Sequence, residues 1–180
     1  MGLRRPDRRP LGPRWPEAAT SLPDVHGLLP LGPDDVPDLR DFLTRADLTL
    51  SGLDAPTVRL WLLRDSNGLV QGSTGYEVSD SGRDVLIRSV AVDSALRANG
   101  LGLRLAQFAL DEAARLGAQR AWLFSRRSGP FWQRLGFTPA NRDDLAATLS
   151  NTHQVQLFTE TGQLQREVAW SRPLSEANVA

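Results

Sequence analysis

The residues best suited to chemistry lie where a strand-like run, ending in Val90-Ala91-Val92, leads into a helical period. Between them stands Arg97-Ala98-Asn99-Gly100-Leu101-Gly102. The first N–H groups of a helix have no partner within the helix, and the helix dipole adds positive charge there. Glycine has no Cβ, so a phosphate can approach the backbone closely. The spacing predicts a site for a phosphate or diphosphate, with Arg97 supplying a further positive charge.

Two common nucleotide-binding motifs do not fit this loop. The dinucleotide fingerprint needs a third glycine three residues after Gly102, and Leu105 stands there; it also needs a parallel βαβ unit, whereas predicted hairpins precede the loop. All 21 basic residues are arginines, so the chain has no lysine for a Walker-type phosphate loop. The anion site must therefore belong to another class.

Composition excludes several other chemistries. The chain has no cysteine, which removes thiol nucleophiles and disulfides, and its two histidines, His26 and His153, lie far apart in the sequence. We therefore expect no metal site and no Ser-His-Asp triad, and we take His153 for a surface or tail residue. Basic and acidic residues number 21 each, which disfavours a nucleic-acid-binding role. No apolar run approaches the roughly 20 residues of a membrane span, so we expect no membrane association and a cytoplasmic protein.

Hydrophobic periodicity predicts a mixed α/β fold preceded by a tail. Residues 1–27 are rich in arginine and proline and are predicted to be disordered, residues 28–174 form one domain, and residues 175–180 fray. Strands are predicted at 28–31, 58–64, 69–78, 85–92, 120–126, 154–159 and 165–171, and helices at 33–46, 102–116, 129–135 and 143–150. Turn signals such as Asn67-Gly68 make the first strands antiparallel. The pattern predicts a mainly antiparallel sheet of about six to seven strands with helices on both faces.

Two motifs in order resemble the GNAT superfamily of acyl-CoA-dependent N-acetyltransferases. The first is Arg97-x-x-Gly100-x-Gly102 after the Val-Ala-Val strand, and the second is the aromatic stretch 131–137, which closes with Gly136-Phe137. Within the superfamily, the chain looks most similar to the arsenic-resistance type, a group near the amino-acid N-acetyltransferases. Glu77 two residues after Gly75, the run at 86–92 and the segment 142–154 carry that likeness. Members of that group often have a Cys-Pro near their end, where this chain reads Leu157-Phe158-Thr159.

The resemblance implies acetyl-CoA as cosubstrate, held in a gap between two strands that splay apart. The implied acetyl-CoA residues are Val90, Ala91, Val92, Arg97, Ala98, Asn99, Gly100, Leu101, Gly102, Ser125 and Phe131. Backbone groups of the strand would bind the acetyl carbonyl and pantetheine, and the amides after Arg97 would bind the diphosphate. Ser125 replaces a frequent asparagine. The acceptor amine would attack the thioester directly, with no covalent intermediate on the enzyme.

The proton-handling positions depart from the family pattern. Leu86 stands where many relatives have a glutamate base, and Trp132, a candidate for substrate contact, stands where many have a tyrosine acid. Cross-strand pairing of Glu77 with Leu86 makes Glu77 the best substitute as catalytic base. Arg88 lies diagonally on the same face. Three hypotheses stay open: Glu77 is the base, Arg88 holds a substrate carboxylate, or the two form a structural ion pair.

The sequence thus predicts a cytoplasmic, bacterial-type N-acetyltransferase acting on a small-molecule primary amine, such as an amino acid or an amino-acid-like toxin. The alternatives are a non-catalytic acyl-CoA-binding module and a protein acetyltransferase that finds its partner through the arginine-rich tail. Residues 48–55 and the segment after Phe137 are expected to set acceptor specificity. We expect a monomer or a homodimer.

Overall fold

The computed structural model describes residues 25–174. The predicted disorder of the N-terminal tail and the predicted fraying of residues 175–180 fall on residues 1–24 and 175–180, outside the described part. Within that part, no helix is long and apolar enough to cross a membrane.

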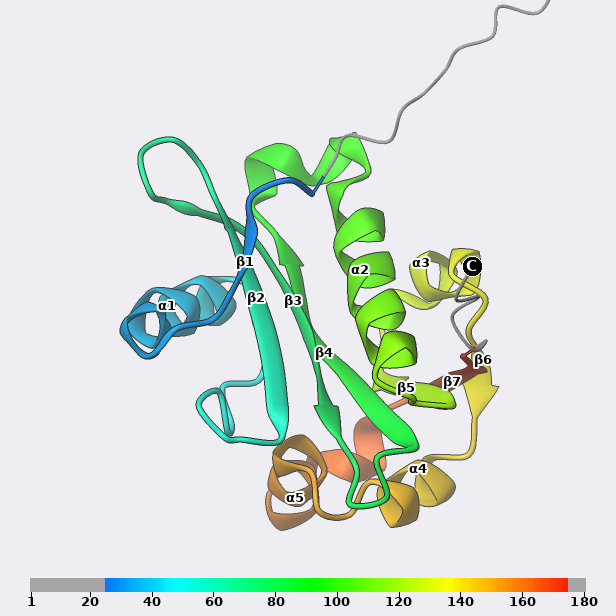
Figure 1. Cartoon of the computed structure of the whole chain (residues 1–180). Helices are drawn as coiled ribbons and strands as arrows, with labels where there is room; N and C mark the ends of the chain where they lie inside the picture. Colours follow the sequence, from blue (N-terminus) through cyan, green and yellow to red (C-terminus); the bar gives the residue numbers. More distant parts are fainter. Residues whose placement is uncertain (1–24, 175–180) are drawn as a thin grey trace, which may run out of the picture.

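The centre of the protein is a seven-stranded sheet in the order β1-β2-β3-β4-β5-β7-β6 (Figure 1). The strands are β1 (Leu28–Pro30), β2 (Val58–Arg64), β3 (Val70–Val78), β4 (Asp84–Val92), β5 (Arg120–Phe124), β6 (Thr138–Ala140) and β7 (Ala169–Pro173). All neighbouring strands are antiparallel except β4 and β5, which are parallel. The predicted fold class, a mixed α/β fold with a mainly antiparallel sheet, is confirmed.

Helices cover both faces of the sheet (Figure 1). They are α1 (Val36–Arg45), α2 (Leu101–Arg115), α3 (Gly129–Arg134), α4 (Arg142–Thr148) and α5 (His153–Glu160), with 3₁₀ turns η1 (Pro33–Asp35), η2 (Ser94–Asn99) and η3 (Gln163–Arg166). Helices α2 and α3 share one core cluster with the sheet, and α1 shares another. Buried residues of α4 and α5 pack with Leu86 and Trp122 in a third cluster.

Along β2, β3 and β4, successive side chains point to opposite faces of the sheet, so neighbouring residues pack against different helices. Tyr76 and Ile87 belong to the α2 cluster, whereas Leu60 belongs to the α1 cluster. Glu77, next to Tyr76, therefore points to the face covered by α1 and α5. Its predicted pairing with Leu86 is confirmed. The sheet thus separates a face lined by α2 from a face that carries Glu77.

The prediction of a strand at 154–159 is wrong, because residues 153–160 form α5. Gln154, Val155 and Phe158 are buried at helical spacing and pack on the sheet. The predicted strand at 165–171 begins as η3 and becomes β7 only at Ala169, while β6 was not foreseen. The helix predicted at 102–116 ends at Arg115, and Leu116 is exposed.

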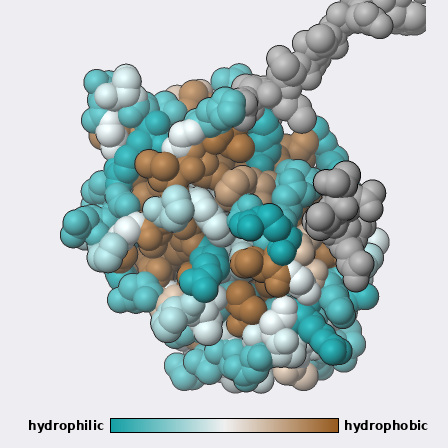
Figure 2. All heavy atoms as spheres, viewed as in Figure 1, coloured by the Kyte–Doolittle hydropathy of each residue, from teal (hydrophilic) through white to brown (hydrophobic). Residues whose placement is uncertain are grey.

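The surface seen in Figure 2 mixes apolar and polar side chains, with apolar areas towards the middle and polar areas around the margin. The exposed large hydrophobic residues of the described chain include Leu29, Leu69 and Val168. Isolated apolar side chains of this kind are ordinary on a soluble domain and carry no functional argument.

Gly75 of β3 lies directly against the backbone of β2, opposite Leu60. A Cβ at this position would stand 2.1 Å from the Arg59 carbonyl oxygen and 2.6 Å from a Leu60 methyl carbon. Since the nearest atom is backbone, the clash cannot be relieved by a side-chain rotation. Gly75 is therefore required by packing.

We expect Gly75→Ala to lower the free energy of unfolding by about 3 kcal/mol, because β2 must move away from β3. The comparison is Gly82→Ala in the β3–β4 turn, where no atom lies within 4 Å of the added Cβ but φ is +71°. That variant should cost only about 1 kcal/mol. Urea denaturation measures both, and equal losses would contradict the packing argument.

Candidate active site

Strand β4 leaves its parallel partner after three residues. Within the described chain, the β4–β5 ladder joins Asp84–Leu86 to Arg120–Trp122 and stops there, although β4 continues to Val92. Beyond Leu86, the edge of β4 that faces β5 has no ladder partner. Backbone N–H and C=O groups need partners, so this edge is suited to bind an extended ligand.

A bulge in the same stretch of β4 redirects its backbone. Thr74 of β3 stands opposite two residues of β4, Ser89 and Val90, between the pairs Gly75–Arg88 and Ser73–Ala91. Ser89 has a φ of +58°, which is unusual for a residue other than glycine. Ser73 Oγ fixes the bulge by donating to the Ser89 carbonyl at 2.6 Å. The bulge therefore sets the direction of Val90 at the point where β4 is free of β5.

The β4–α2 connection delivers a helix start to the end of the free edge. Asp93 caps η2 by accepting from the Ala95 amide, and Gly100 begins α2 with a φ of +70°. Only glycine adopts this conformation without strain. The first intrahelical bond runs from Arg104 N to Gly100 O, which leaves the earlier amides of α2 for other acceptors.

A cleft of about 720 Å³ joins the free edge of β4 to this helix start. Its walls are Ala46, Leu48, Val90, Ala91, Val92, Arg97, Ala98, Gly100, Gly102, Leu103, Ser128, Phe131, Trp132 and Arg134. Two arginines and no acidic side chain line it. A Cβ at Gly102 would meet Val92 at 3.5 Å and Phe131 at 3.7 Å, so a larger side chain here would fill the cleft. The charge and the narrow wall both fit a diphosphate and its chain.

Most of the residues predicted to hold acetyl-CoA lie together in this cleft. Asn99 and Leu101 belong to the same connection but do not line the cleft. Ser125 lies outside it, and its hydroxyl accepts from the Ser128 amide at 3.1 Å. Trp132 packs edge-on against Phe131 and Phe137. Tyr76, the only tyrosine of the chain, is buried in the α2 cluster, and burial raises the pKa of its hydroxyl.

A second cavity of about 450 Å³ adjoins the first and shares Ala46, Leu48 and Ser128 with it. Its walls come from the end of α1, the loop after β5, α5 and η3, and they include Asp47, Thr49, Ser125, Arg126, Arg127, Gln154, Phe158, Gln163 and Glu167. Both segments predicted to set acceptor specificity contribute to these walls. Gln154 and Glu167 were missed because the segment 154–159 was read as a strand and no motif marks Glu167.

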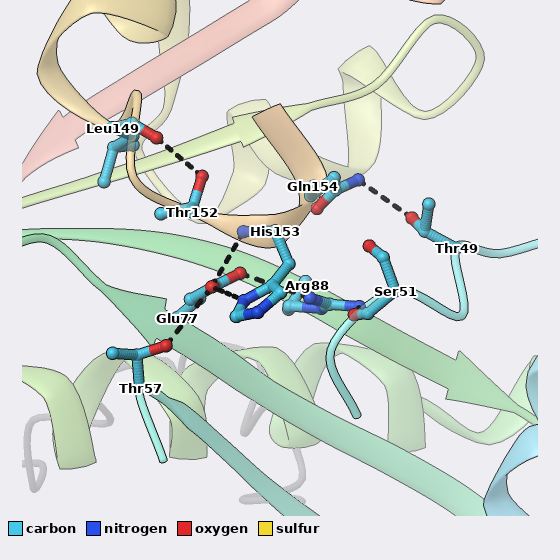
Figure 3. Close-up of polar contacts among 9 residues, drawn as sticks. All are labelled: Thr49, Ser51, Thr57, Glu77, Arg88, Leu149, Thr152, His153 and Gln154. Carbon is cyan, nitrogen blue, oxygen red and sulfur yellow. Dashed lines mark hydrogen bonds and ion pairs between the residues drawn. The ribbon is translucent and has the colours of Figure 1, made fainter. Parts of the chain in front are cut away.

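Glu77 is fully buried and its carboxylate is surrounded by donors (Figure 3). Its Oε1 accepts from the His153 amide at 2.8 Å and from Thr57 at 3.3 Å, and His153 Nδ1 lies 2.6 Å away. Its Oε2 accepts from Arg88 at 3.2 Å. His153, expected to be a surface or tail residue, has a side chain that is 40% exposed, and its ring also lies against Glu77. Neither Glu77 nor Arg88 lines the cleft or the second cavity.

Arg88 connects Glu77 to the loop after α1. One guanidinium nitrogen donates to Glu77, and another donates to the Ser51 carbonyl at 2.7 Å. Burial lowers the pKa of Arg88, and the nearby Glu77 carboxylate offsets part of this effect. The Glu77 carboxylate also caps α5, since the His153 amide belongs to the first turn and Thr152 provides no side-chain cap. The cluster holds two walls of the second cavity, the 48–55 loop and α5, against the sheet.

Within residues 25–174, no group of three or more His, Asp or Glu side chains is arranged to hold a metal ion.

Comparison with known proteins agrees with this geometry. The model of the acetyltransferase (GNAT) family matches residues 28–137. The chain belongs to this family and is an acetyl-CoA-dependent acetyltransferase. No match was found among the curated proteins.

Solved structures with the same fold include enzymes and complexes of several kinds. N-acetylglutamate synthase from Neisseria gonorrhoeae, complexed with coenzyme A and N-acetyl-glutamate, is 17% identical with a TM-score of 0.64; the match covers 82% of this chain but only 35% of that one. Rv2747 from Mycobacterium tuberculosis, in complex with CoA and a second ligand, is 20% identical with a TM-score of 0.61, covering 79% and 95%. The ribosomal-protein-S18-alanine N-acetyltransferase from Escherichia coli is 15% identical with a TM-score of 0.57, covering 84% and 96%.

We expect Arg97→Ala to weaken binding of coenzyme A about fivefold, because an exposed cation next to the diphosphate site is lost. Binding of pantetheine, which lacks the diphosphate, should not change. Calorimetric titration of both ligands measures the difference. Arg83→Ala, at the exposed β3–β4 turn, is the matched control. Equal weakening for both ligands would contradict the placement of the diphosphate at Arg97.

Proposed function

We propose that this protein acetylates the primary amine of a small molecule, with acetyl-CoA in the cleft and the acceptor in the second cavity. The observation that carries the proposal is the junction of the two spaces at Ala46, Leu48 and Ser128. The two arginines of the cleft suit a diphosphate, and the volume of the second cavity suits a small metabolite. Reactants entering from the two sides would meet at this junction.

The cleft residues would position and polarise the thioester. The free backbone edge of β4 near Val90 offers amide groups to the acetyl carbonyl and pantetheine, and the amides at the start of α2 take the diphosphate. Acetyl-CoA supplies an activated acyl group. The amine nitrogen then forms a bond to the acyl carbon, the carbon–sulfur bond breaks, the nitrogen loses a proton and the thiolate gains one. Placement of two reactants in contact accounts for much of the acceleration in such a transfer.

Among the three hypotheses for Glu77 and Arg88, the contacts favour the structural ion pair. Each oxygen of Glu77 already accepts at least one hydrogen bond, and the Arg88 side chain is 1% exposed. A base must reach the acceptor amine directly or through one water molecule. A substrate carboxylate would have to displace Glu77 from Arg88. We infer that the pair holds the acceptor walls in place rather than touching the substrate.

A screen of amines with acetyl-CoA tests the proposed function. We expect thiol release to rise well above the rate of spontaneous hydrolysis for one group of small primary amines. Peptides with free N-termini or lysines form a second arm and represent the protein-acetyltransferase alternative. Release with peptides alone would replace the proposed acceptor class. Binding of coenzyme A without release in either arm would identify a non-catalytic acyl-CoA-binding module.

We expect Glu77→Gln to lower the free energy of unfolding by about 3 kcal/mol, because Arg88 keeps its buried charge without a counter-charge. The kcat of the folded protein should change less than about twofold if the pair is structural. Glu160→Gln, at an exposed position of α5, is the control. A fall in kcat of about a hundredfold with loss of pH dependence would instead show that Glu77 is the catalytic base.

A further inference from the structure

Leu48 lines both the acetyl-CoA cleft and the second cavity, and it is the large residue among those that the two walls have in common. The other shared residues, Ala46 and Ser128, are small. Phe131 and Trp132 line the cleft but do not reach the second cavity. The width of the passage between the two spaces therefore depends mainly on the side chain of Leu48.

The end of α1 holds the backbone of Leu48 in place. The Leu48 amide donates to the Leu43 carbonyl at 3.0 Å. The preceding amide, that of Asp47, donates to the Thr44 carbonyl at 3.2 Å, and Asp47 itself has a φ of +56°. Two such bonds around a left-handed residue form a Schellman motif, a common helix ending. Leu48 thus has a defined backbone position at the junction, although it follows the last turn of the helix.

The residues that follow Leu48 are tied to α5 and to the sheet. Thr49 Oγ1 accepts from Gln154 Nε2 at 3.0 Å (Figure 3). The Ser51 carbonyl accepts from Arg88 of β4 at 2.7 Å. The loop is therefore anchored on both sides of Leu48. A bulky ligand cannot push this segment aside without breaking hydrogen bonds.

The side chain of Leu48 does not belong to the protein core. It is 37% exposed, and it is part of none of the three core clusters. In a Schellman motif the residue at this position frequently packs back against the helix. Leu48 instead offers apolar carbon atoms to the space where the cleft and the second cavity meet. An apolar surface at this place is suited to contact an acyl chain.

We propose that Leu48 sets the length of the acyl group that the protein can transfer. The inference rests on the proposed function, which places the thioester where the two spaces meet. An acetyl group ends beside Leu48, whereas the further carbons of a butyryl group need the volume that its side chain fills. Replacement of leucine by alanine removes more carbon atoms than butyryl adds to acetyl. Leu48 is thus a specificity-determining residue for the acyl donor.

Binding of acyl-CoA without an amine is the first test. We expect the full chain to bind acetyl-CoA about tenfold more tightly than butyryl-CoA in calorimetric titrations, since carbons that do not fit an apolar pocket have effects of at least this order. In Leu48→Ala the two dissociation constants should agree within about twofold. Leu48→Ile keeps the side-chain volume and should retain the preference. Leu69→Ala, at an exposed leucine in the β2–β3 turn, is the control.

Turnover with the most active amine of the screen is the second test. The ratio of kcat/KM for butyryl-CoA to kcat/KM for acetyl-CoA should rise about tenfold in Leu48→Ala and stay unchanged in Leu69→Ala. A general loss of stability would affect both donors equally and leave this ratio as it is.

Equal use of the two donors by the unmodified protein would overturn the inference while the proposed function stands. The same holds for a Leu48→Ala variant whose ratios match those of Leu69→Ala. Discrimination between the two donors in binding, without thiol release for any amine, would support the role of Leu48 and overturn the proposed function. The two failures are therefore distinguishable.

Discussion

The site depends on the separation of two parallel strands. Once the β4–β5 ladder ends at Leu86 and Trp122, the remaining β4 edge has backbone groups that a sheet would otherwise satisfy. The bulge at Ser89 and Val90 directs this edge, and the loop after Val92 brings the start of α2 to its end. One wall of the cleft, the free edge of β4 at Val90 to Val92, thus follows from this interruption of hydrogen bonding.

Local sequence patterns were sufficient for the elements that build this half of the site. The apolar period of α2, the turns between β2, β3 and β4, and the Gly100-x-Gly102 spacing all involve residues close together in the chain. The Glu77–Leu86 register also followed from turn length alone. These features are predictable because their causes are local: hydrophobic period, turn chemistry and the conformational freedom of glycine.

The second cavity was not predictable in the same way. Residues 154–159 alternate polar and apolar side chains nearly as a strand would, and the helix that they form is capped by Glu77, 76 residues away from His153 in the sequence. The contact that decides the structure is therefore tertiary. The same is true of Gln154 and Glu167, which line one cavity only because α5 and the segment before β7 fold beside the loop after β5. No local signal connects them.

The neighbouring residues His153 and Gln154 have different contacts at the start of α5. The His153 amide donates to the Glu77 carboxylate in the sheet, whereas Gln154 lines the second cavity and donates to Thr49. Because the attachment to the sheet runs through the amide and the ring of His153, a substitution at residue 154 can change the wall of the cavity without removing that attachment.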